Sequence, residues 1–232
     1  MERDPERVVA IVLAAGVGRR VGAPEPKAFL TIGGRPMLAV TAGAAVASPA
    51  VGSLVVAAPP GWEDRARECL EACGKPVTVI SGGATRQASV RVALDALAAG
   101  TEVVAVHDAA RPFAPPDLFS AVIDGVDERF PGVVPVVPVT DTVKQVAEGQ
   151  VLGTLDRERL GLAQTPQAFD VATLRDAHGR AAASGVVLTD DASALERDGC
   201  IVRAIAGDPM NVKITTLLDL AQAEARMGGA DG

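Results

Sequence analysis

A short segment of small residues, followed by two arginines and a lysine, stands near the start of the chain. It reads Ala14-Ala15-Gly16-Val17-Gly18-Arg19-Arg20, and Lys27 follows a few residues later. Small residues let the backbone approach a ligand closely, and its exposed N–H groups can bind phosphate oxygens. Arginine and lysine add fixed positive charge. We therefore predict a phosphate-binding loop.

Two familiar phosphate-binding patterns do not fit this segment. A Walker A loop requires Gly-x4-Gly-Lys-Ser/Thr, which is absent. The dinucleotide fingerprint requires Gly-x-Gly-x-x-Gly, and the third glycine position is Val21. Two arginines suit a triphosphate better than a dinucleotide. A Gly-x-Gly turn alone would also fit a tight strand–helix connection, so the prediction depends on the cations.

The elements that position this loop follow from hydrophobic patterning. Apolar runs typical of buried strands cover residues 8–13, 53–58, 77–80, 102–106 and 133–139. Helical patterns cover residues 37–47, 62–73, 85–98 and 116–129. This alternation predicts an α/β fold with a Rossmann-like, mostly parallel sheet flanked by helices. Ligands of such sheets bind at the carboxyl ends of strands, where the loop must lie.

The pattern changes after the fifth predicted strand. Residues 140–154 are polar, alternating and punctuated by glycine, which indicates a protruding β-hairpin. Helices are expected at 170–183, 190–197 and 215–227, and a strand at 200–206. We expect a single domain over residues 1–232, with an arm at about 139–158.

Composition narrows the functional classes. The net charge is −7 and no dense basic face is apparent, which argues against nucleic-acid binding. No apolar run reaches the roughly 18 residues of a membrane span. Three cysteines without a spacing framework fit a reducing compartment, so we expect a cytoplasmic protein.

Six further motifs, in one order, raise the specificity of these observations. They are residues 82–89 (GGATRQAS), 106–112 (VHDAARP), 141–144 (DTVK), 165–167 (TPQ), 189–193 (TDDAS) and 211–213 (NVK). Together with the loop they resemble the 2-C-methyl-D-erythritol 4-phosphate cytidylyltransferases of the non-mevalonate isoprenoid route, over about residues 8–226. The resemblance implies transfer of CMP from CTP to methylerythritol phosphate, with release of pyrophosphate. It also implies a homodimer in which the arm contacts the other subunit.

The resemblance assigns roles residue by residue. The catalytic positions are Arg20, Lys27, Arg157 and Lys213. The nucleotide-binding positions are Ala14, Ala15, Gly16, Gly18, Gly83, Ser89 and Asp108. The substrate-binding positions are Arg111, Thr142, Thr165 and Thr189. Asp108 follows an apolar strand beside the expected phosphates, so it is also the expected ligand of Mg²⁺ or another divalent cation.

Three further points limit these assignments. His107 needs no role as a general base, because a phosphate nucleophile is already ionised at neutral pH. Leu13 stands where the family often has proline, which should alter turn rigidity and not chemistry. Ala84 stands where some members have an acidic residue, so the strictness of CTP selection depends on whether backbone groups read the base.

Two other functions remain open from the sequence. Another sugar-phosphate or polyol-phosphate nucleotidyltransferase would share the phosphate loop, and only the later motifs argue against it. A non-catalytic nucleotide-binding module would leave the combination of four residues unexplained: Arg20, Lys27, Asp108 and Lys213.

Overall fold

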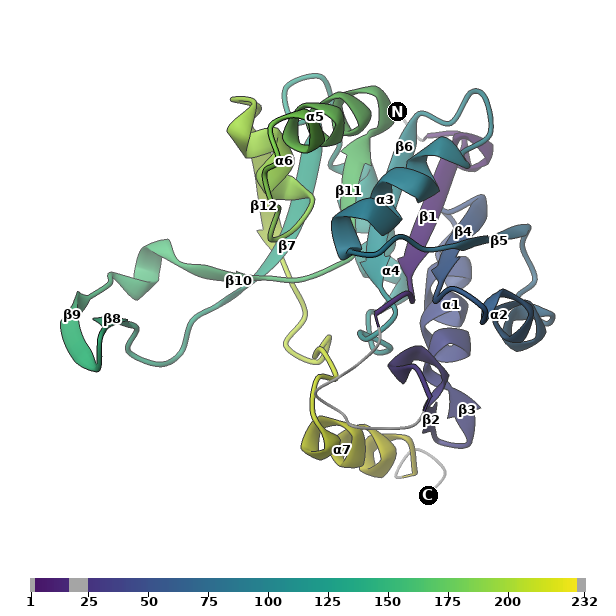
Figure 1. Cartoon of the computed structure of the whole chain (residues 1–232), viewed down its shortest axis with the longest axis horizontal. Coiled ribbons are helices and arrows are strands. Elements are labelled where there is room, and N and C mark those ends of the chain that lie inside the picture. Colours follow the sequence, from purple (N-terminus) through teal and green to yellow (C-terminus); the bar gives the residue numbers. More distant parts are fainter. Residues whose placement is uncertain (1–2, 17–24, 229–232) are drawn as a thin grey trace.

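The computed structural model of the chain describes residues 3–16 and 25–228. Its main feature is an eight-stranded sheet with helices on both faces (Figure 1). The strands are β1 (Val8–Leu13), β4 (Ser53–Ala58), β5 (Val77–Ser81), β6 (Val103–Asp108), β7 (Gly132–Pro138), β10 (Gly161–Ala163), β11 (Gln167–Asp170) and β12 (Val202–Ala206). The order is β10-β7-β11-β6-β1-β4-β5, with β12 paired to β7.

The sheet is mixed but mostly parallel, as the alternation predicts. Strands β4, β1 and β6 are parallel neighbours, and β5 and β12 extend the sheet in the same sense. Only β10 and β11 run antiparallel to their partners. The chain crosses from β1 to β4 on one side and later returns to β6 on the other. The carboxyl end of β1 is therefore a topological switch point, where open α/β sheets bind ligands.

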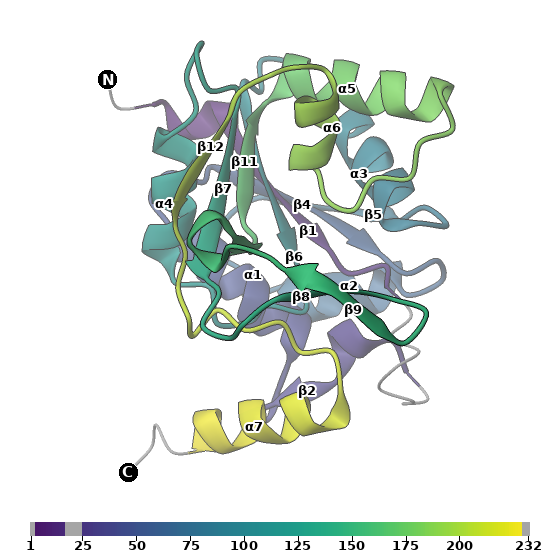
Figure 2. The same ribbon diagram turned by 90° about the vertical axis from the view of Figure 1, so that its left-hand side faces the viewer.

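Helices cover both faces of this sheet because its central strands are buried on both sides. The helices are α1 (Met37–Ala47), α2 (Glu63–Leu70), α3 (Arg86–Asp95), α4 (Pro116–Asp124), α5 (Val171–Ala183), α6 (Ala192–Arg197) and α7 (Leu217–Gly228). Figure 2 shows α4 on one side of the sheet and α3, α5 and α6 on the other. In β1, Val8, Ala10 and Val12 pack in the cluster with α1, α2 and α4, whereas Val9 and Ile11 pack in the cluster with α3, α5 and α6. This alternation is the period of two expected of a strand.

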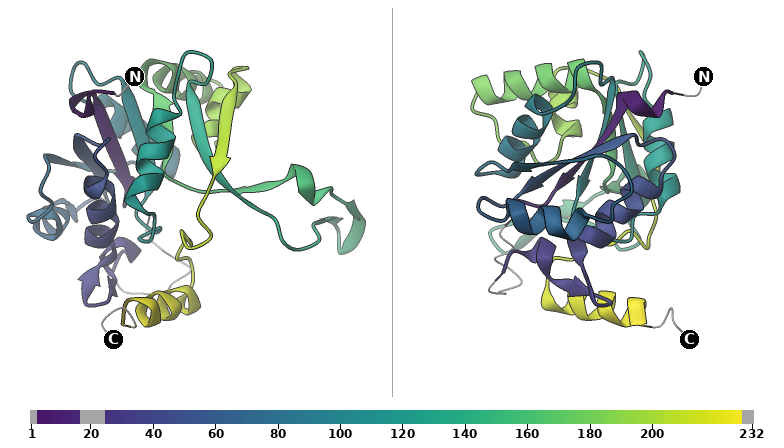
Figure 3. Two further views of the ribbon diagram at one scale, coloured as in Figure 1. Left: turned by 180° about the vertical axis from the view of Figure 1, so that it is seen from behind. Right: turned by 90° about the vertical axis from the view of Figure 1, so that its right-hand side faces the viewer.

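The predicted hairpin arm is present. Strands β8 (Lys144–Ala147) and β9 (Gln150–Thr154) pair antiparallel and extend away from the sheet (Figures 1 and 3). Glu148 and Gly149 both have positive φ, as tight hairpin turns require. Val146, Val151 and Leu152 are largely exposed on it. A contact with a second subunit stays a prediction.

Several predicted elements end elsewhere, and some strands are not predicted at all. Helix α4 stops at Asp124 instead of residue 129, because the Asp127 carboxylate accepts from the backbone N–H groups of Arg129 and Phe130 and forms a turn. Helix α2 ends at Leu70, and Gly74 has φ +78° in the turn that follows. Strands β10 and β11 were not expected.

A short hairpin and the last helix pack together outside the main sheet. The hairpin β2 (Thr31–Ile32) and β3 (Arg35–Pro36) packs against α7, with Ile32, Met37, Ile214 and Ala223 in a separate apolar cluster. Among the described residues, no helix is both long and apolar enough to cross a membrane.

Candidate active site

A cavity of about 330 Å³ lies at the carboxyl ends of β1 and β6 and beside the segment that follows β5. Its lining residues are Leu13, Ala14, Ala15, Gly16, Lys27, Ala28, Gly83, Ala84, Thr85, Arg86, Ser89, Asp108, Ala109, Ala110, Lys213 and Thr215. Among these described residues there are three cations and one carboxylate. The cavity is therefore positive although the chain is acidic, and it can attract an anion.

Small residues are required where the phosphate loop meets the turn after β5. A Cβ on Gly82 would lie 2.4 Å from the Cβ of Ala15 and 3.0 Å from the Ala58 carbonyl oxygen. A Cβ on Gly83 would lie 2.5 Å from the Cβ of Ala88. Contacts this short are not tolerated, so a side chain at 82 would force the two loops apart, and a side chain at 83 would clash with the start of α3. The sequence pattern of small residues thus encodes a close approach between two loops.

The same turn leads into α3, whose first residues border the cavity. The Thr85 hydroxyl caps α3 by accepting from the Ala88 N–H at 3.0 Å. The Ser89 hydroxyl accepts from the Gly83 N–H at 3.1 Å and donates to the Thr85 carbonyl at 2.9 Å. Ser89 therefore fixes the shape of the turn. A helix N-terminus directed at a cavity adds partial positive charge there.

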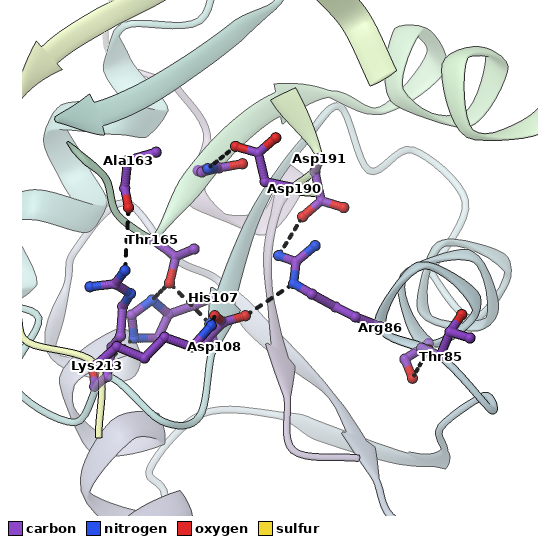
Figure 4. A network of polar contacts seen from close by, with 12 residues as sticks. Thr85, Arg86, His107, Asp108, Ala163, Thr165, Asp190, Asp191 and Lys213 are labelled. Atoms are coloured by element: carbon purple, nitrogen blue, oxygen red, sulfur yellow. Dashed lines mark hydrogen bonds and ion pairs between the residues drawn. The ribbon is translucent and has the colours of Figure 1, made fainter. Parts of the chain in front are cut away.

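Asp108 is the centre of the polar network in this cavity (Figure 4). Its Oδ1 accepts from Arg86 Nε at 3.2 Å, and its Oδ2 accepts from Lys213 Nζ at 2.5 Å. Burial by itself would raise the pKa of Asp108, but Arg86 and Lys213 outweigh that effect and hold its pKa well below the usual range. Asp108 is therefore a carboxylate at any pH near neutrality.

His107 lies beneath this carboxylate and is completely buried. Its Nε2 lies 3.1 Å from the Arg111 carbonyl oxygen, which can only accept, so Nε2 carries the proton. Its Nδ1 then accepts from the Thr165 hydroxyl at 2.9 Å, and that hydroxyl in turn accepts from the Asp108 N–H at 3.1 Å. Burial lowers the pKa of His107 to about 4. His107 is thus a neutral link between two segments, with no ring nitrogen left for proton transfer.

Two more cations lie near this network. Lys27 Nζ donates to the Ile214 carbonyl at 2.7 Å and lines the cavity. Arg111 donates to the carbonyls of Asn211 and Ala163 at 2.8 and 3.3 Å, and burial lowers its pKa from the usual value. Arginine nevertheless stays protonated in proteins.

The structure brings most of the residues named from the sequence to this cavity. The residues that line it are Ala14, Ala15, Gly16, Lys27, Gly83, Ser89, Asp108 and Lys213. Thr165 and Arg111 are joined to them through His107 and Asp108. Arg20 and Gly18 lie outside the described residues. Thr142, Arg157 and Thr189 are exposed and do not line the cavity, and the first two belong to the arm.

Sequence reasoning assigned no role to three residues of the network. Arg86 bridges Asp108 and Asp191, and His178 contacts Asp191 from the other side. Arg86 and Asp191 stand inside recognised motifs, whereas the lone His178 in a helix gave no signal. Their connection depends on chain segments about 100 residues apart in the sequence, so no local pattern reports it.

A positively charged cavity at the switch point of a Rossmann-like sheet, with small-residue loops and one carboxylate, defines an enzyme of the nucleotidyltransferase class. A family model described as 2-C-methyl-D-erythritol 4-phosphate cytidylyltransferase matches residues 8–229. Curated proteins with that name are similar over nearly the whole chain. One from Streptomyces coelicolor is 46% identical over 96% of this chain and 86% of its own length. One from Saccharopolyspora erythraea is 45% identical over 94% and 98%.

Two solved structures are similar to this chain over nearly its whole length. The cytidylyltransferase of Thermus thermophilus is 36% identical with a TM-score of 0.78, covering 94% of this chain and 98% of its own. The 4-diphosphocytidyl-2C-methyl-D-erythritol synthase of Anaerococcus prevotii has a TM-score of 0.85 at 29% identity, covering 95% and 98%. The chain belongs to the 2-C-methyl-D-erythritol 4-phosphate cytidylyltransferase family. It is an enzyme that transfers CMP from CTP to 2-C-methyl-D-erythritol 4-phosphate in isoprenoid precursor synthesis.

Proposed function

We propose that the cavity around Asp108 is where this chain performs the cytidylyl transfer, and that its cations supply most of the catalysis. The observation that carries this proposal is that three cations, Lys27, Arg86 and Lys213, line one cavity together with a single buried carboxylate. In the reaction, an oxygen of the 4-phosphate attacks the α-phosphorus of CTP. A new P–O bond forms while the bond to the bridging oxygen breaks, and pyrophosphate leaves. Both reactants are anions, so alignment and positive charge are what the protein must provide.

Lys27 and Arg20 are proposed to stabilise the charge that develops at the α-phosphate. Lys27 is supported by its place in the cavity wall. Arg20 rests on its position after the phosphate loop in the sequence. Lys213 is proposed to exchange its contact with Asp108 for a phosphate oxygen when the substrates bind, because both partners face the same cavity. No protein base is needed, in agreement with the neutral and fully bonded His107.

The nucleotide is proposed to bind across the two small-residue loops. Ala14, Ala15, Gly16 and Gly18 would offer backbone N–H groups to the triphosphate, and Gly83 and Ser89 would border the cytidine. The close packing of Gly82 on Ala15 supports a shared binding surface, because it places the two loops side by side. Ala84 is exposed and short, so selection of cytosine would use backbone groups.

Methylerythritol phosphate is proposed to contact Arg111 and Thr165 in the body of the subunit. Thr142 and Arg157 would approach the same substrate from the arm of a second subunit, and Thr189 would border it. The support is that the arm extends away from the sheet of its own subunit (Figure 1) and carries exposed apolar side chains. We therefore propose a homodimer related by a two-fold axis.

A divalent cation fits the residues of the cavity. Each oxygen of Asp108 accepts one hydrogen bond, and a carboxylate has about four lone-pair sites, so capacity remains for a metal ion. In the described part of the chain, no group of three or more His, Cys, Asp or Glu side chains could hold a metal by itself. We propose that Asp108 and substrate phosphate oxygens together hold Mg²⁺, which would neutralise phosphate charge.

Two further proposals concern the whole chain. We propose that residues 1–232 form a single domain whose arm spans about 139–158. We also propose a cytoplasmic location, which is supported by the three unpaired cysteines Cys69, Cys73 and Cys200.

The decisive experiment measures pyrophosphate release from CTP with and without methylerythritol phosphate. Release should require both substrates and a divalent cation, and Asp108→Asn should reduce it strongly. Equal turnover with ATP or GTP, full activity in excess chelator, or full activity of Asp108→Asn would each overturn the proposed roles.

A further inference from the structure

The polar network at Asp108 continues away from the cavity into the helical layer. Arg86 uses Nε for Asp108, and its Nη2 donates to Asp191 Oδ2 at 2.7 Å (Figure 4). The other oxygen of Asp191 accepts from His178 Nε2 at 3.1 Å. A line of contacts thus runs from α5 through the start of α6 and the start of α3 to the end of β6.

Asp191 does not have the local role that its position suggests. It is the N-cap residue of α6 but makes no capping hydrogen bond. The cap is provided by Asp190, whose Oδ1 accepts from the Ser193 N–H at 3.0 Å. Asp191 is only 1% exposed, and each of its oxygens accepts one hydrogen bond, from Arg86 or from His178. Burying a carboxylate costs free energy unless its oxygens are paired. Because Asp191 caps no helix, its pairing with Arg86 is what accounts for this buried carboxylate.

His178 fixes the direction of Asp191. It is buried, and because a carboxylate can only accept, its Nε2 carries the proton. Its Nδ1 has no hydrogen-bond partner within the described residues. The hydrogen bond from Nε2 is therefore the polar contact of this ring among the described residues, and it holds Oδ1 of Asp191 toward α5.

The consequence for the cavity follows from the shape of the arginine side chain. A guanidinium group is a planar fork that matches both oxygens of one carboxylate. Arg86 divides this fork between two carboxylates, and Asp108 keeps its Oδ2 for Lys213. Without Asp191, Arg86 would keep Asp108 as its carboxylate partner and could take both of its oxygens, displacing Lys213.

We propose that Asp191, oriented by His178, is a positioning residue that draws Arg86 away from full pairing with Asp108 and so keeps Asp108 and Lys213 ready for the substrates. Asp191 does not line the cavity, so it acts through Arg86 and not through contact with a substrate. This inference rests on the role proposed for Asp108.

The first test compares Asp191→Asn with a matched control, Asp198→Asn. Asp198 pairs with Arg180 at 2.7 Å, also joins α5 to the end of α6, and does not line the cavity. Asp191→Asn should lower kcat about tenfold to a hundredfold, the usual effect of losing a group that orients a functional carboxylate. Binding of CTP measured by calorimetry should change much less, and Asp198→Asn should keep normal kcat. Equal loss of kcat in the two variants, or normal kcat in Asp191→Asn, would overturn the proposal.

The second test asks whether Asp191 acts through Arg86. In an Arg86→Gln background, Asp191→Asn should change kcat by less than about twofold, because the group on which it acts is gone. Multiplicative losses in the double variant would contradict the proposal. A crystal structure of Asp191→Asn should show Arg86 paired with both oxygens of Asp108, and an unmoved Arg86 would contradict it as well.

A further pair of variants covers the case in which Asp191→Asn does not fold. His178→Gln keeps an N–H donor for Asp191, whereas His178→Leu does not, so Gln should retain more kcat than Leu at similar melting temperatures. Equal kcat values would overturn the part assigned to His178.

Two variants distinguish failure of this inference from failure of the proposed function. If Asp108→Asn is inactive but Asp191→Asn is fully active, only this inference fails. If Asp108→Asn is fully active, the proposed function fails first.

Discussion

His107 makes a quantitative prediction about the pH dependence of stability. In the folded chain this histidine is fully buried and neutral, and its pKa is lowered from 6.5 to about 4. In the unfolded chain it is solvated and titrates near 6.5. Above pH 6.5 both states are neutral there and this group contributes no pH dependence. Between pH 6.5 and 4 only the unfolded state binds the proton, so the free energy of unfolding falls as the pH falls.

The size of this effect follows from the two pKa values. They differ by roughly 2.5 pH units, and each unit corresponds to about 1.4 kcal/mol, so His107 removes about 3 kcal/mol of stability below pH 4. Most of that loss should already be present at pH 4.5. His107→Gln removes the titrating group while keeping an amide that can donate to the Arg111 carbonyl.

The assay is urea denaturation of wild type and His107→Gln at pH 7 and pH 4.5. Trp62 is the only tryptophan and stacks on Phe29 with ring centroids 5.0 Å apart, so its fluorescence reports unfolding. At pH 7 the variant should be less stable by about 1–3 kcal/mol, because the buried hydrogen bonds are imperfectly replaced. At pH 4.5 that deficit should shrink by about 2–3 kcal/mol.

The chain has one other histidine, His178, which is present in both proteins, so its contribution cancels in the comparison. A deficit that stays constant between the two pH values would refute the reasoning. It would mean that His107 is not held neutral, or that the folded state opens before the proton binds.

Three further predictions concern the cavity and the arm. Lys27→Ala should lower kcat by roughly 10²–10³-fold with little change in CTP affinity, because a cation aimed at developing charge acts in the transition state. A raised KM at unchanged kcat would rule out that role. Gly82→Ala should lower the free energy of unfolding in urea by about 1–3 kcal/mol and raise the KM for CTP, because its Cβ would lie 2.4 Å from the Cβ of Ala15. The control Gly179→Ala has open space around the new Cβ, so its stability should be unchanged or slightly higher. Mixing Lys27→Ala with Arg157→Ala subunits should restore roughly a quarter of normal activity if Arg157 serves the partner's site, because half of the dimers are hybrids with one intact site. A mixture that exchanges subunits yet stays inactive would place Arg157 in its own subunit's site.

The local sequence was sufficient for the parallel part of the fold. Strands β1 and β4 have the residue ranges predicted for them, because a strand buried on both faces is a continuous apolar run that ends at small or turn residues. The arm could be predicted for the opposite reason, since its alternation is polar and interrupted by glycine. Strand β11 could not, because four residues beginning with Gln167 and ending at a helix cap carry no strand pattern; its pairing between β6 and β7 makes it a strand.

The candidate site divides in the same way. The loop at residues 14–16, Lys27, Asp108 and Lys213 could be named from the sequence, because phosphate chemistry needs small residues, cations and a carboxylate. The tertiary structure decided what each side chain faces. It made His107 a neutral link to Thr165 and gave Arg86 two carboxylate partners, and it turned Asp191 away from its helix cap. Residue type is a local property, but pairing and burial join segments far apart in the chain, and only the folded backbone brings them together.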